Sequence, residues 1–442
     1  EGIKKAIEEA NSTNKSLFFP KGDYMVSGVW IFELQSGMHI YGEGTKSRIF
    51  ISPTNKDWRA LFYSNPANLI EDVYIHDLYL DCNVNNNVIS DTNGFKNTGR
   101  IMVYFNNAKN IRLESNKIKY NGFWAFRGKS VTASILKNDF YFDQSNITQT
   151  EFDTSCVWWG GKNNRIESNK FDSNNINGWV ARTAIEFQGF RNSVRFNRIN
   201  NFIQAVIISN SSSYQLDNQV LDMPERGNHS SVISDNVCLV QSGVIIWPLD
   251  TGDNETIKDL HIINNIFNLK MFKPTRASQG IFTNRDIQKE FVEGLVIKNN
   301  TFTSEDRDST ISRAIDLTPT FDIIGCDISD NKIKGFNTGL RIGLFTINNS
   351  DGSVLDPNNK KLINFNVSNN HFEECLLPIE LVPKVGSARF TNNHFSQKNT
   401  YEIGKNTIML IKMYGVLDSA DLYWENNTTS YPSNVRPFNP SE

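Results

Sequence analysis

Long apolar runs and an excess of basic residues are both missing from this chain of 442 residues. No stretch approaches 18 consecutive apolar residues, so we expect no membrane insertion. The formal net charge is −3 and no basic cluster stands out, which argues against a nucleic-acid partner. With 39% hydrophobic and 21% charged residues, the composition is that of a folded protein.

Cysteine is also scarce. There are five, at positions 82, 156, 238, 326 and 375, and their odd number and wide spacing form neither a disulfide framework nor a C-x-x-C metal pattern. We predict small buried thiols, no metal and no cofactor. A calcium ion at the acidic loop DTGDNE (250–255) is a weaker alternative, because surface turns are commonly rich in Asp and Gly.

Asn and Phe, by contrast, are abundant, and one short phrase recurs: alternating apolar and polar residues, then Asn, then another alternating pair. Examples are IRLESNKI ending at Ile118, LVIKNNTF ending at Phe302 and FNVSNNHF ending at Phe372. The Asn positions are 116, 138, 169, 197, 236, 265, 300, 331, 370, 393 and 427, and we assign the first place to Asp77. The intervals average about 32 residues and vary from 22 to 39, which indicates a solenoid turn of fixed form with loops of variable length.

The phrase has a physical cause. Period-two alternation predicts strands with one buried face. Asn tolerates the left-handed conformation of a sharp bend, and stacked Asn side chains can bond to one another along the axis. Stacked Phe rings would explain the 30 Phe residues, and His371 and His394, at one common offset, should stack outside the bend rather than bind a metal. The phrase therefore predicts a parallel β-helix of about 11–12 turns.

The first residues predict a cap for this solenoid. Ile3, Ala6 and Ile7 form an apolar stripe, so residues 1–11 suit an amphipathic helix over the open end of the first turn. We place the capping helix and first strands in 1–50, and the β-helix body in 51–442. Loop insertions are expected at about 82–99, 141–154, 210–230 and 346–361. The segment around Asn218 resembles the recurring phrase, but it lies too close to Asn236 to be a separate turn, so we assign 210–230 to a loop.

EGIKKAIEEAN, SLFFPKGDYMVSG and IYGEGTKSRI, together with the Asn phrase, resemble the pectate-lyase-like right-handed single-stranded parallel β-helix superfamily. The long irregular loops look most like a bacteriophage tailspike or appendage depolymerase. This resemblance implies an extracellular virion-tail protein, a homotrimer and a bacterial surface polysaccharide as partner. No catalytic signature of pectate lyases or polygalacturonases is present, so no site residue is carried over.

Candidate site residues come instead from aligning the strands that follow the Asn turns. One outward column then contains Tyr104, Arg127, Trp158 and Glu186 on consecutive turns. Aromatic faces stack on sugar rings and charged groups orient hydroxyls or acidic substituents. We expect Glu186 as acid or nucleophile with Asp153 as second carboxyl, and a substrate-binding set that is completed by Arg182, Gln188 and Trp247. A solvated sheet face is the structural alternative.

The column continues through Ile207, Ile245 or Trp247, and Phe282 or Asn284 to Asp316, Arg341 and Glu380. Asp286 with Asp316 is a second candidate carboxyl pair, and Arg341 a further candidate for substrate binding. A structural ion-pair ladder along the sheet explains these last charges at least as well.

The sequence thus predicts a depolymerase that cleaves capsule, lipopolysaccharide or wall polymer, either as a glycoside hydrolase or as a polysaccharide lyase. The alternatives are an adhesin that binds glycan without cutting it, and a secreted lyase, hydrolase or epimerase.

Overall fold

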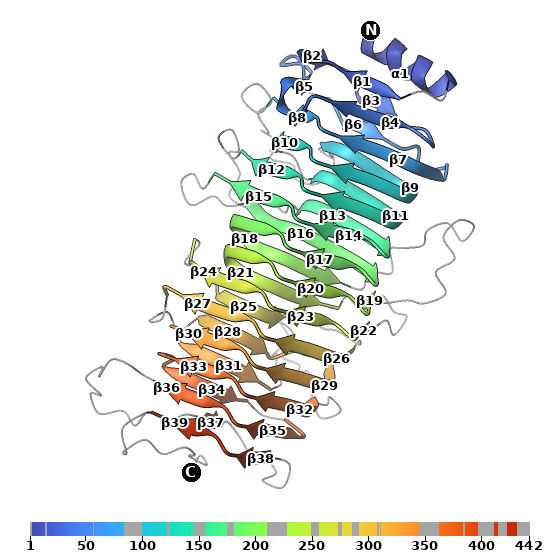
Figure 1. Cartoon of the computed structure of the whole chain (residues 1–442). Helices are drawn as coiled ribbons and strands as arrows, with labels where there is room; N and C mark the ends of the chain where they lie inside the picture. The colour runs from blue at the N-terminus through green and yellow to red at the C-terminus, as the bar shows by residue number, and fades with distance from the viewer. Residues whose placement is uncertain are drawn as a thin grey trace, which may run out of the picture. The chain divides into compact units, whose positions relative to one another are not determined.

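The recurring phrase supplies strands that pair in parallel with the strands of neighbouring copies, and the chain is a right-handed parallel β-helix in this computed structural model (Figure 1). The predicted fold class is therefore confirmed. The structure describes residues 2–13, 16–55, 57–83, 100–121, 124–143, 145, 155–174, 181–209, 228–248, 256–272, 276–284, 291–306, 309, 311–343, 362–382, 385–396, 411–413 and 422–430. In this part of the chain no helix has the length and hydropathy needed to cross a membrane.

The chain divides into unit 1 (Glu1–Val206 with Ser213–Glu225) and unit 2 (Ile207–Ser212 with Arg226–Glu442). Each unit has three faces of parallel strands. The pre-Asn face contains the strands before the ladder Asn, the post-Asn face those directly after it, and the column face the strands that carry the predicted outward column. Long strands bend and contribute to two faces.

In unit 1, the pre-Asn face consists of β1 (Leu17–Phe19), β4 (His39–Gly42), β7 (Ile70–His76), the ends of β9 (Ile101–Glu114) and β11 (Trp124–Leu136), β14 (Arg165–Glu167) and β17 (Ser193–Arg195). The post-Asn face consists of β2 (Gly22–Val26), β5 (Ser47–Ile51), β8 (Tyr79–Asp81), β10 (Lys117–Tyr120), β12 (Asp139–Phe142), β15 (Lys170–Ser173) and the start of β18 (Arg198–Ser209). The column face consists of β3 (Trp30–Glu33), β6 (Ala60–Tyr63), the starts of β9 and β11, β13 (Ser155–Lys162) and β16 (Ala181–Phe190).

In unit 2, the pre-Asn face consists of β20 (Val232–Ser234), β23 (His261–Ile263), the ends of β26 (Phe291–Lys298) and β29 (Asp322–Ser329), β32 (Leu362–Ser368), β35 (Ala388–Thr391) and β38 (Leu422–Glu425). The post-Asn face consists of the start of β21 (Val237–Trp247), β24 (Ile266–Leu269), β27 (Thr301–Ser304), β30 (Lys332–Lys334), β33 (His371–Glu373), β36 (His394–Ser396) and β39 (Thr428–Thr429). The column face consists of the end of β21, β25 (Ser278–Thr283), β28 (Ser312–Leu317), β31 (Thr338–Ile342), β34 (Leu377–Leu381) and β37 (Ile411–Met413). The short strands β19 (Asn228–His229) and β22 (Ile257–Lys258) pair with each other, and β22 also pairs with the start of β26.

The predicted Asn ladder is present in both units. In unit 1 the amide nitrogen of Asn116 donates to Oδ1 of Asn138 (3.1 Å), and the same bond links Asn138 to Asn169 and Asn169 to Asn197. In unit 2 an equivalent chain of side-chain bonds runs from Asn236 through residues 265, 300, 331, 370 and 393 to 427. Each link binds neighbouring turns at the bend, where backbone pairing is interrupted.

Two details of the predicted bend are wrong. The first ladder place belongs to Leu78, whose backbone N–H donates to Oδ1 of Asn116 (3.2 Å), and not to Asp77. The left-handed residue is also not the ladder Asn but the residue before it, as at Asp77 (φ 51°), Ser115 (φ 55°) and Asn299 (φ 60°). The Asn is therefore selected for its hydrogen bonds, and its neighbour makes the turn.

Unit 1 contains a second, shorter ladder that the sequence analysis missed. The Asn164 amide donates to Oδ1 of Asn192 (3.1 Å), and the Ser130 hydroxyl donates to Oδ1 of Asn164 (2.8 Å). Both Asn residues lie five positions before a main-ladder Asn, in NNRIESN and RNSVRFN. That spacing was the available signal.

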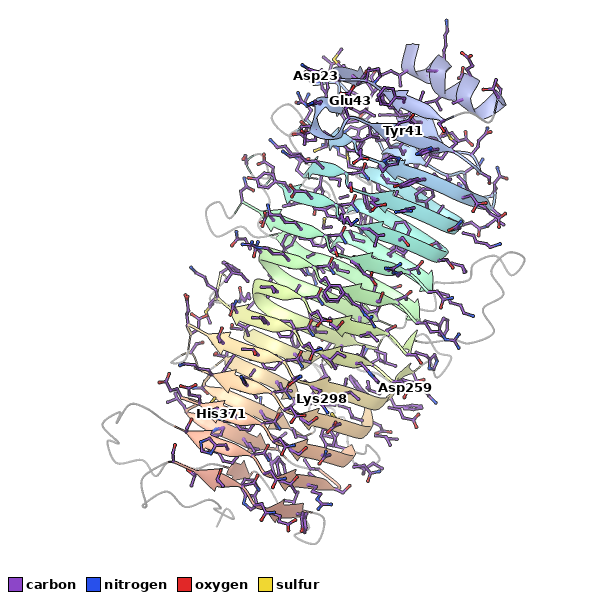
Figure 2. The ribbon with its side chains drawn as sticks, in the orientation of Figure 1. Asp23, Tyr41, Glu43, Asp259, Lys298 and His371 are labelled. Atoms are coloured by element: carbon purple, nitrogen blue, oxygen red, sulfur yellow. The ribbon has the colours of Figure 1, made fainter. Side chains whose placement is uncertain are left out.

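The core is apolar and stacked. The Phe140 and Phe171 rings are 4.7 Å apart and parallel, and Phe267 stacks on Phe302 at 5.3 Å. All five cysteines are buried free thiols, as predicted. His371 (Figure 2) and His394 are register neighbours, as predicted, and their ring centroids lie 4.9 Å apart with the ring planes tilted by 38°.

Helix α1 (Gly2–Thr13) packs beside β1 at the N-terminal end of unit 1 (Figure 1). It buries Ile7 and Ala10 and exposes its charged residues, as the predicted capping helix requires. The strands β1–β6 form turns that the Asn phrase does not mark. Nearly all residues of the four predicted insertions lie outside the described part of the chain, so those boundaries stay predictions.

Candidate functional site

The predicted outward column exists on the column face of unit 1. Strand register places Tyr104 beside Arg127, Arg127 beside Trp158, and Trp158 beside Glu186. The chain neighbours of these side chains, such as Phe126 and Trp159, are buried, which is why the column residues point out. The four residues are therefore consecutive neighbours, about 4.8 Å apart from strand to strand.

The column extends further towards the N-terminus than the sequence analysis recognised. Tyr63 pairs with Tyr104, and Glu33 pairs with Tyr63. Both were missed because the strands before IMVYF were not aligned. We define the outer column as Glu33, Tyr63, Tyr104, Arg127, Trp158 and Glu186.

Five aromatic side chains follow this column. We name Trp30, Tyr63, Tyr104, Trp124 and Trp158 the aromatic strip. The Trp30 ring lies 5.1 Å from that of Tyr63 and 6.2 Å from that of Tyr104, and Trp30 is 48% exposed. The Arg127 guanidinium lies 4.4 Å from the Trp124 ring centroid, 5.1 Å from that of Trp158 and 5.8 Å from that of Tyr104. The strip offers partly exposed ring faces on several neighbouring turns.

Glu186 stands at the end of the outer column, and side chains of β13 and β16 donate to its carboxylate. The Ser155 hydroxyl donates to Oε2 (2.6 Å), the Trp158 indole N–H donates to Oε1 (3.0 Å), and the Gln188 amide donates to Oε1 (3.3 Å). Glu186 is nevertheless partly exposed. Because these donors lie on the neighbouring strands β13 and β16, they fix the orientation of the carboxylate.

The remaining candidates of this cluster have different positions. Gln188 is buried and reaches Glu186 from its own strand, so it orients that carboxylate. Arg182 lies on the same strand and is partly exposed. Asp153 lies outside the described residues, and its pairing with Glu186 stays a prediction.

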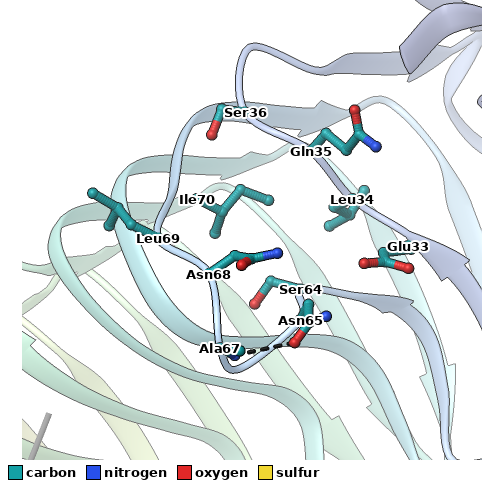
Figure 3. A pocket seen from close by; sticks show the side chains of 10 residues that line it. All are labelled: Glu33, Leu34, Gln35, Ser36, Ser64, Asn65, Ala67, Asn68, Leu69 and Ile70. Carbon is teal, nitrogen blue, oxygen red and sulfur yellow. Dashed lines mark hydrogen bonds between the residues drawn. The ribbon is translucent and has the colours of Figure 1, made fainter. Parts of the chain in front are cut away.

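A hollow of about 460 Å³ adjoins the other end of the outer column (Figure 3). Glu33 forms part of its wall, and Ser64 follows Tyr63 directly. Polar side chains line much of it, including Asn65, whose Oδ1 accepts from the Ala67 N–H (3.0 Å), and Asn68. No sequence pattern marks this hollow, because its wall comes from two connections between strands, at residues 33–36 and 64–70.

The column of unit 2 has another character. Strand register places Ile245, Phe282, Asp316, Arg341 and Glu380 in line. The column therefore contains Ile245 and not Trp247, and Phe282 and not Asn284. Trp247 lies two residues beyond the column on β21 and is partly buried. Asp286, like the acidic loop 250–255, lies outside the described residues.

The charges of this second column are satisfied within the protein. Asp316 is 1% exposed and accepts from Gln279 (2.8 Å), Arg313 (3.1 Å) and Thr318 (2.6 Å). Nε of Arg341 lies 3.1 Å from a Glu380 carboxylate oxygen, and both side chains are about 10% exposed. This geometry favours the structural ion-pair reading over a catalytic Asp316.

Within the described residues no three His, Cys, Asp or Glu side chains gather into a metal site. Neither a family model nor a curated protein matches this sequence.

Solved structures do match the fold. The tailspike protein of E. coli bacteriophage HK620 in complex with pentasaccharide superimposes with a TM-score of 0.61 at 14% identity, covering 97% of this chain and 76% of the tailspike. A double-substitution variant of that tailspike, also with pentasaccharide, gives the same values, and a deletion variant gives a TM-score of 0.62 at 13% identity. This chain thus shares the parallel β-helix fold of those tailspikes.

Proposed function

We propose that this chain is a tailspike-type protein that binds a bacterial surface polysaccharide along the outer column and cleaves it at Glu186. The observation that carries the proposal is the continuity of the aromatic strip with one oriented, partly exposed carboxylate. Stacked ring faces bind the apolar surface of sugar rings, and the carboxylate supplies a group that glycan cleavage requires. The pentasaccharide complexes of the matching tailspikes support this substrate class.

Trp158 has two roles in this proposal. Its ring is a stacking platform, and its indole N–H holds Glu186 at 3.0 Å. Glu186 acts as nucleophile or acid, with Asp153 as second carboxyl, since hydrolysis uses carboxyls about 5 Å apart for retention or roughly 6.5–9.5 Å for inversion. If the reaction is instead a β-elimination, Arg182 or Arg127 supplies the cation that neutralises a uronate.

The test is a pair of substitutions. Glu186→Gln preserves the shape and should lower cleavage by at least about 10²-fold while binding remains. Trp158→Ala should weaken binding. Glu293→Gln, on β26 of unit 2, where Glu293 binds Lys258, is the matched carboxylate control and should cleave normally.

The assays are new reducing ends for hydrolysis and absorbance of the unsaturated product for a lyase, both on purified bacterial polysaccharide. Cleavage by Glu186→Gln at the native rate would reject this residue as the catalytic group. Binding without any cleavage by the native protein would favour the adhesin alternative.

Two further parts of the proposal concern context. A tailspike would be located on the virion tail, outside the host cell, and would assemble as a homotrimer. A monomer that cleaves glycan would favour a secreted enzyme.

A further inference from the structure

Arg127 is the one member of the outer column that carries a positive charge, and it lies at the centre of the aromatic strip. Its register neighbours are Tyr104 and Trp158, and Trp124 lies on its own strand. No carboxylate of the described residues forms an ion pair with it. Within the described residues, its guanidinium is therefore contacted by ring faces, which attract a cation weakly and do not neutralise its charge.

Several other arginines of the fold have a carboxylate partner. Arg48 binds Asp81, Arg165 binds Glu167 and Arg341 binds Glu380 across or along strands. The same applies to Arg112, Arg313 and Arg389, each of which has a carboxylate partner. The strands thus place an acid beside many outward arginines, whereas Arg127 has aromatic neighbours.

A second cation lies close by. Lys129 follows Arg127 by two residues on β11, so the two side chains leave the strand on the same side. Burial and the charge of Arg127 both lower the pKa of Lys129. Two like charges in a partly desolvated position raise the local positive potential and favour an anion there.

We propose that the polysaccharide is anionic and that Arg127 binds its negatively charged substituent, a carboxylate or a phosphate. This inference rests on the proposed function and specifies its substrate class. A guanidinium over aromatic rings still presents N–H groups along its edge, and this planar fork matches a carboxylate or phosphate in a bidentate manner.

The position also fits a substrate that spans the site. Arg127 is separated from Glu186 by Trp158 alone, so about 10 Å lie between the two positions along the column. The charged sugar residue would then be close to the cleaved bond without approaching the Glu186 carboxylate, which would repel it. Trp158 would stack on the ring between the two.

The experiment uses an array of purified bacterial capsular and O-antigen polysaccharides that includes neutral, uronate-bearing and phosphate-bearing polymers. We expect the native chain to bind polymers with acidic groups, and Arg127→Gln to lower that affinity by about 10-fold or more, as loss of a charged hydrogen-bond pair does. Arg127→Lys keeps the charge without the fork and should fall between the two. Arg389→Gln, which removes an arginine that binds Glu425 on another face, is the control and should bind normally.

Chemical modification of the bound polymer identifies the group. Carboxyl reduction should abolish the Arg127 dependence if the group is a uronate, and removal of phosphate should do so if it is a phosphodiester. Circular dichroism of Arg127→Gln establishes that it is folded.

The outcomes separate the two proposals. Binding of neutral polymers, or an Arg127→Gln affinity equal to that of the native chain for an acidic polymer, would overturn the anionic substrate while leaving glycan binding intact. Binding of no polysaccharide at all would overturn the proposed function itself, and this inference with it.

Discussion

Replacing Asn300 by Ala removes one link from the middle of the unit 2 ladder. Asn300 is 1% exposed, and its Oδ1 accepts from both the backbone N–H (2.9 Å) and the side-chain amide (3.0 Å) of Asn265. Its own amide donates to the carbonyl of Ile262 (2.8 Å) and to Oδ1 of Asn331 (3.1 Å). The substitution therefore removes four hydrogen bonds from the interior.

Their loss does not cost four times the value of one bond. The Asn265 amide keeps the carbonyls of Ile233 and Ile263, and Oδ1 of Asn331 keeps the backbone N–H of residue 300. The Asn265 backbone N–H, in contrast, loses its acceptor in a buried position. One buried donor without a partner costs about 1–3 kcal/mol, which is the expected loss of unfolding free energy.

Two measurements check this magnitude. Urea unfolding followed by circular dichroism should show a lower midpoint with an unchanged slope, which identifies lost stability rather than a changed unfolded state. Lys332→Ala, on the exposed surface of the next turn, is the control. Native-state hydrogen exchange is more specific. The backbone N–H of Asn265 should lose protection, whereas the backbone N–H of Asn331 should keep it, because its acceptor on Asn370 is intact.

A midpoint shift no larger than that of Lys332→Ala would refute the reasoning. An unchanged exchange rate of the Asn265 backbone N–H would refute it independently, since it would mean that this donor does not depend on Asn300 for its acceptor.

Three other predictions concern the backbone, pH and assembly. Gly189→Ala should destabilise the fold by more than Gly44→Ala. A Cβ at Gly189 (φ 102°) would lie 2.1 Å from the Gly161 carbonyl oxygen, whereas a Cβ at Gly44 (φ 66°) would meet open space and cost only about 1–2 kcal/mol of left-handed strain. Equal melting temperatures of the two variants would contradict this. Burial opposes ionisation of Glu167, but hydrogen bonds led by that from Arg165 outweigh burial and lower the pKa of this carboxyl. Its contribution to stability is therefore present above the pKa of the unfolded state and is lost as the pH falls through the pKa of the folded state. Glu167→Gln should flatten the acid limb of a stability–pH curve, and an unchanged limb would show that this carboxyl does not contribute. Light scattering should give three times the chain mass of 50.3 kDa, and a 50 kDa particle would reject the trimer.

The sequence predicted the ladder well because one interaction recurs with one spacing. Each Asn bonds to the next, so the residue type repeats wherever a turn closes. Where the bond has another donor the signal is lost: Leu78 contributes only its backbone N–H, and nothing in its side chain marks it. The Asn164–Asn192 link was missed because a phrase present in two turns does not look like a repeat.

The outer column was predictable for a related reason. Strand alternation decides which side chains point out, and parallel register decides which of them are neighbours, so Arg127, Trp158 and Glu186 could be placed in order. Their partners could not. That the Ser155 hydroxyl and the Trp158 indole both bond to Glu186 depends on side-chain rotamers, which leave no periodic trace in the sequence.

The two units show that the same register produces two different surfaces, and charge neutralisation distinguishes them. In unit 2 the acids and bases of the column bind each other or their own strand, as Arg341 binds Glu380, so the column is complete without a ligand. In unit 1 neutral side chains donate to Glu186, and aromatic rings contact Arg127. Among the described residues Arg127 has no carboxylate partner, and a partly buried charge without one costs stability. The anionic sugar proposed above would supply that partner.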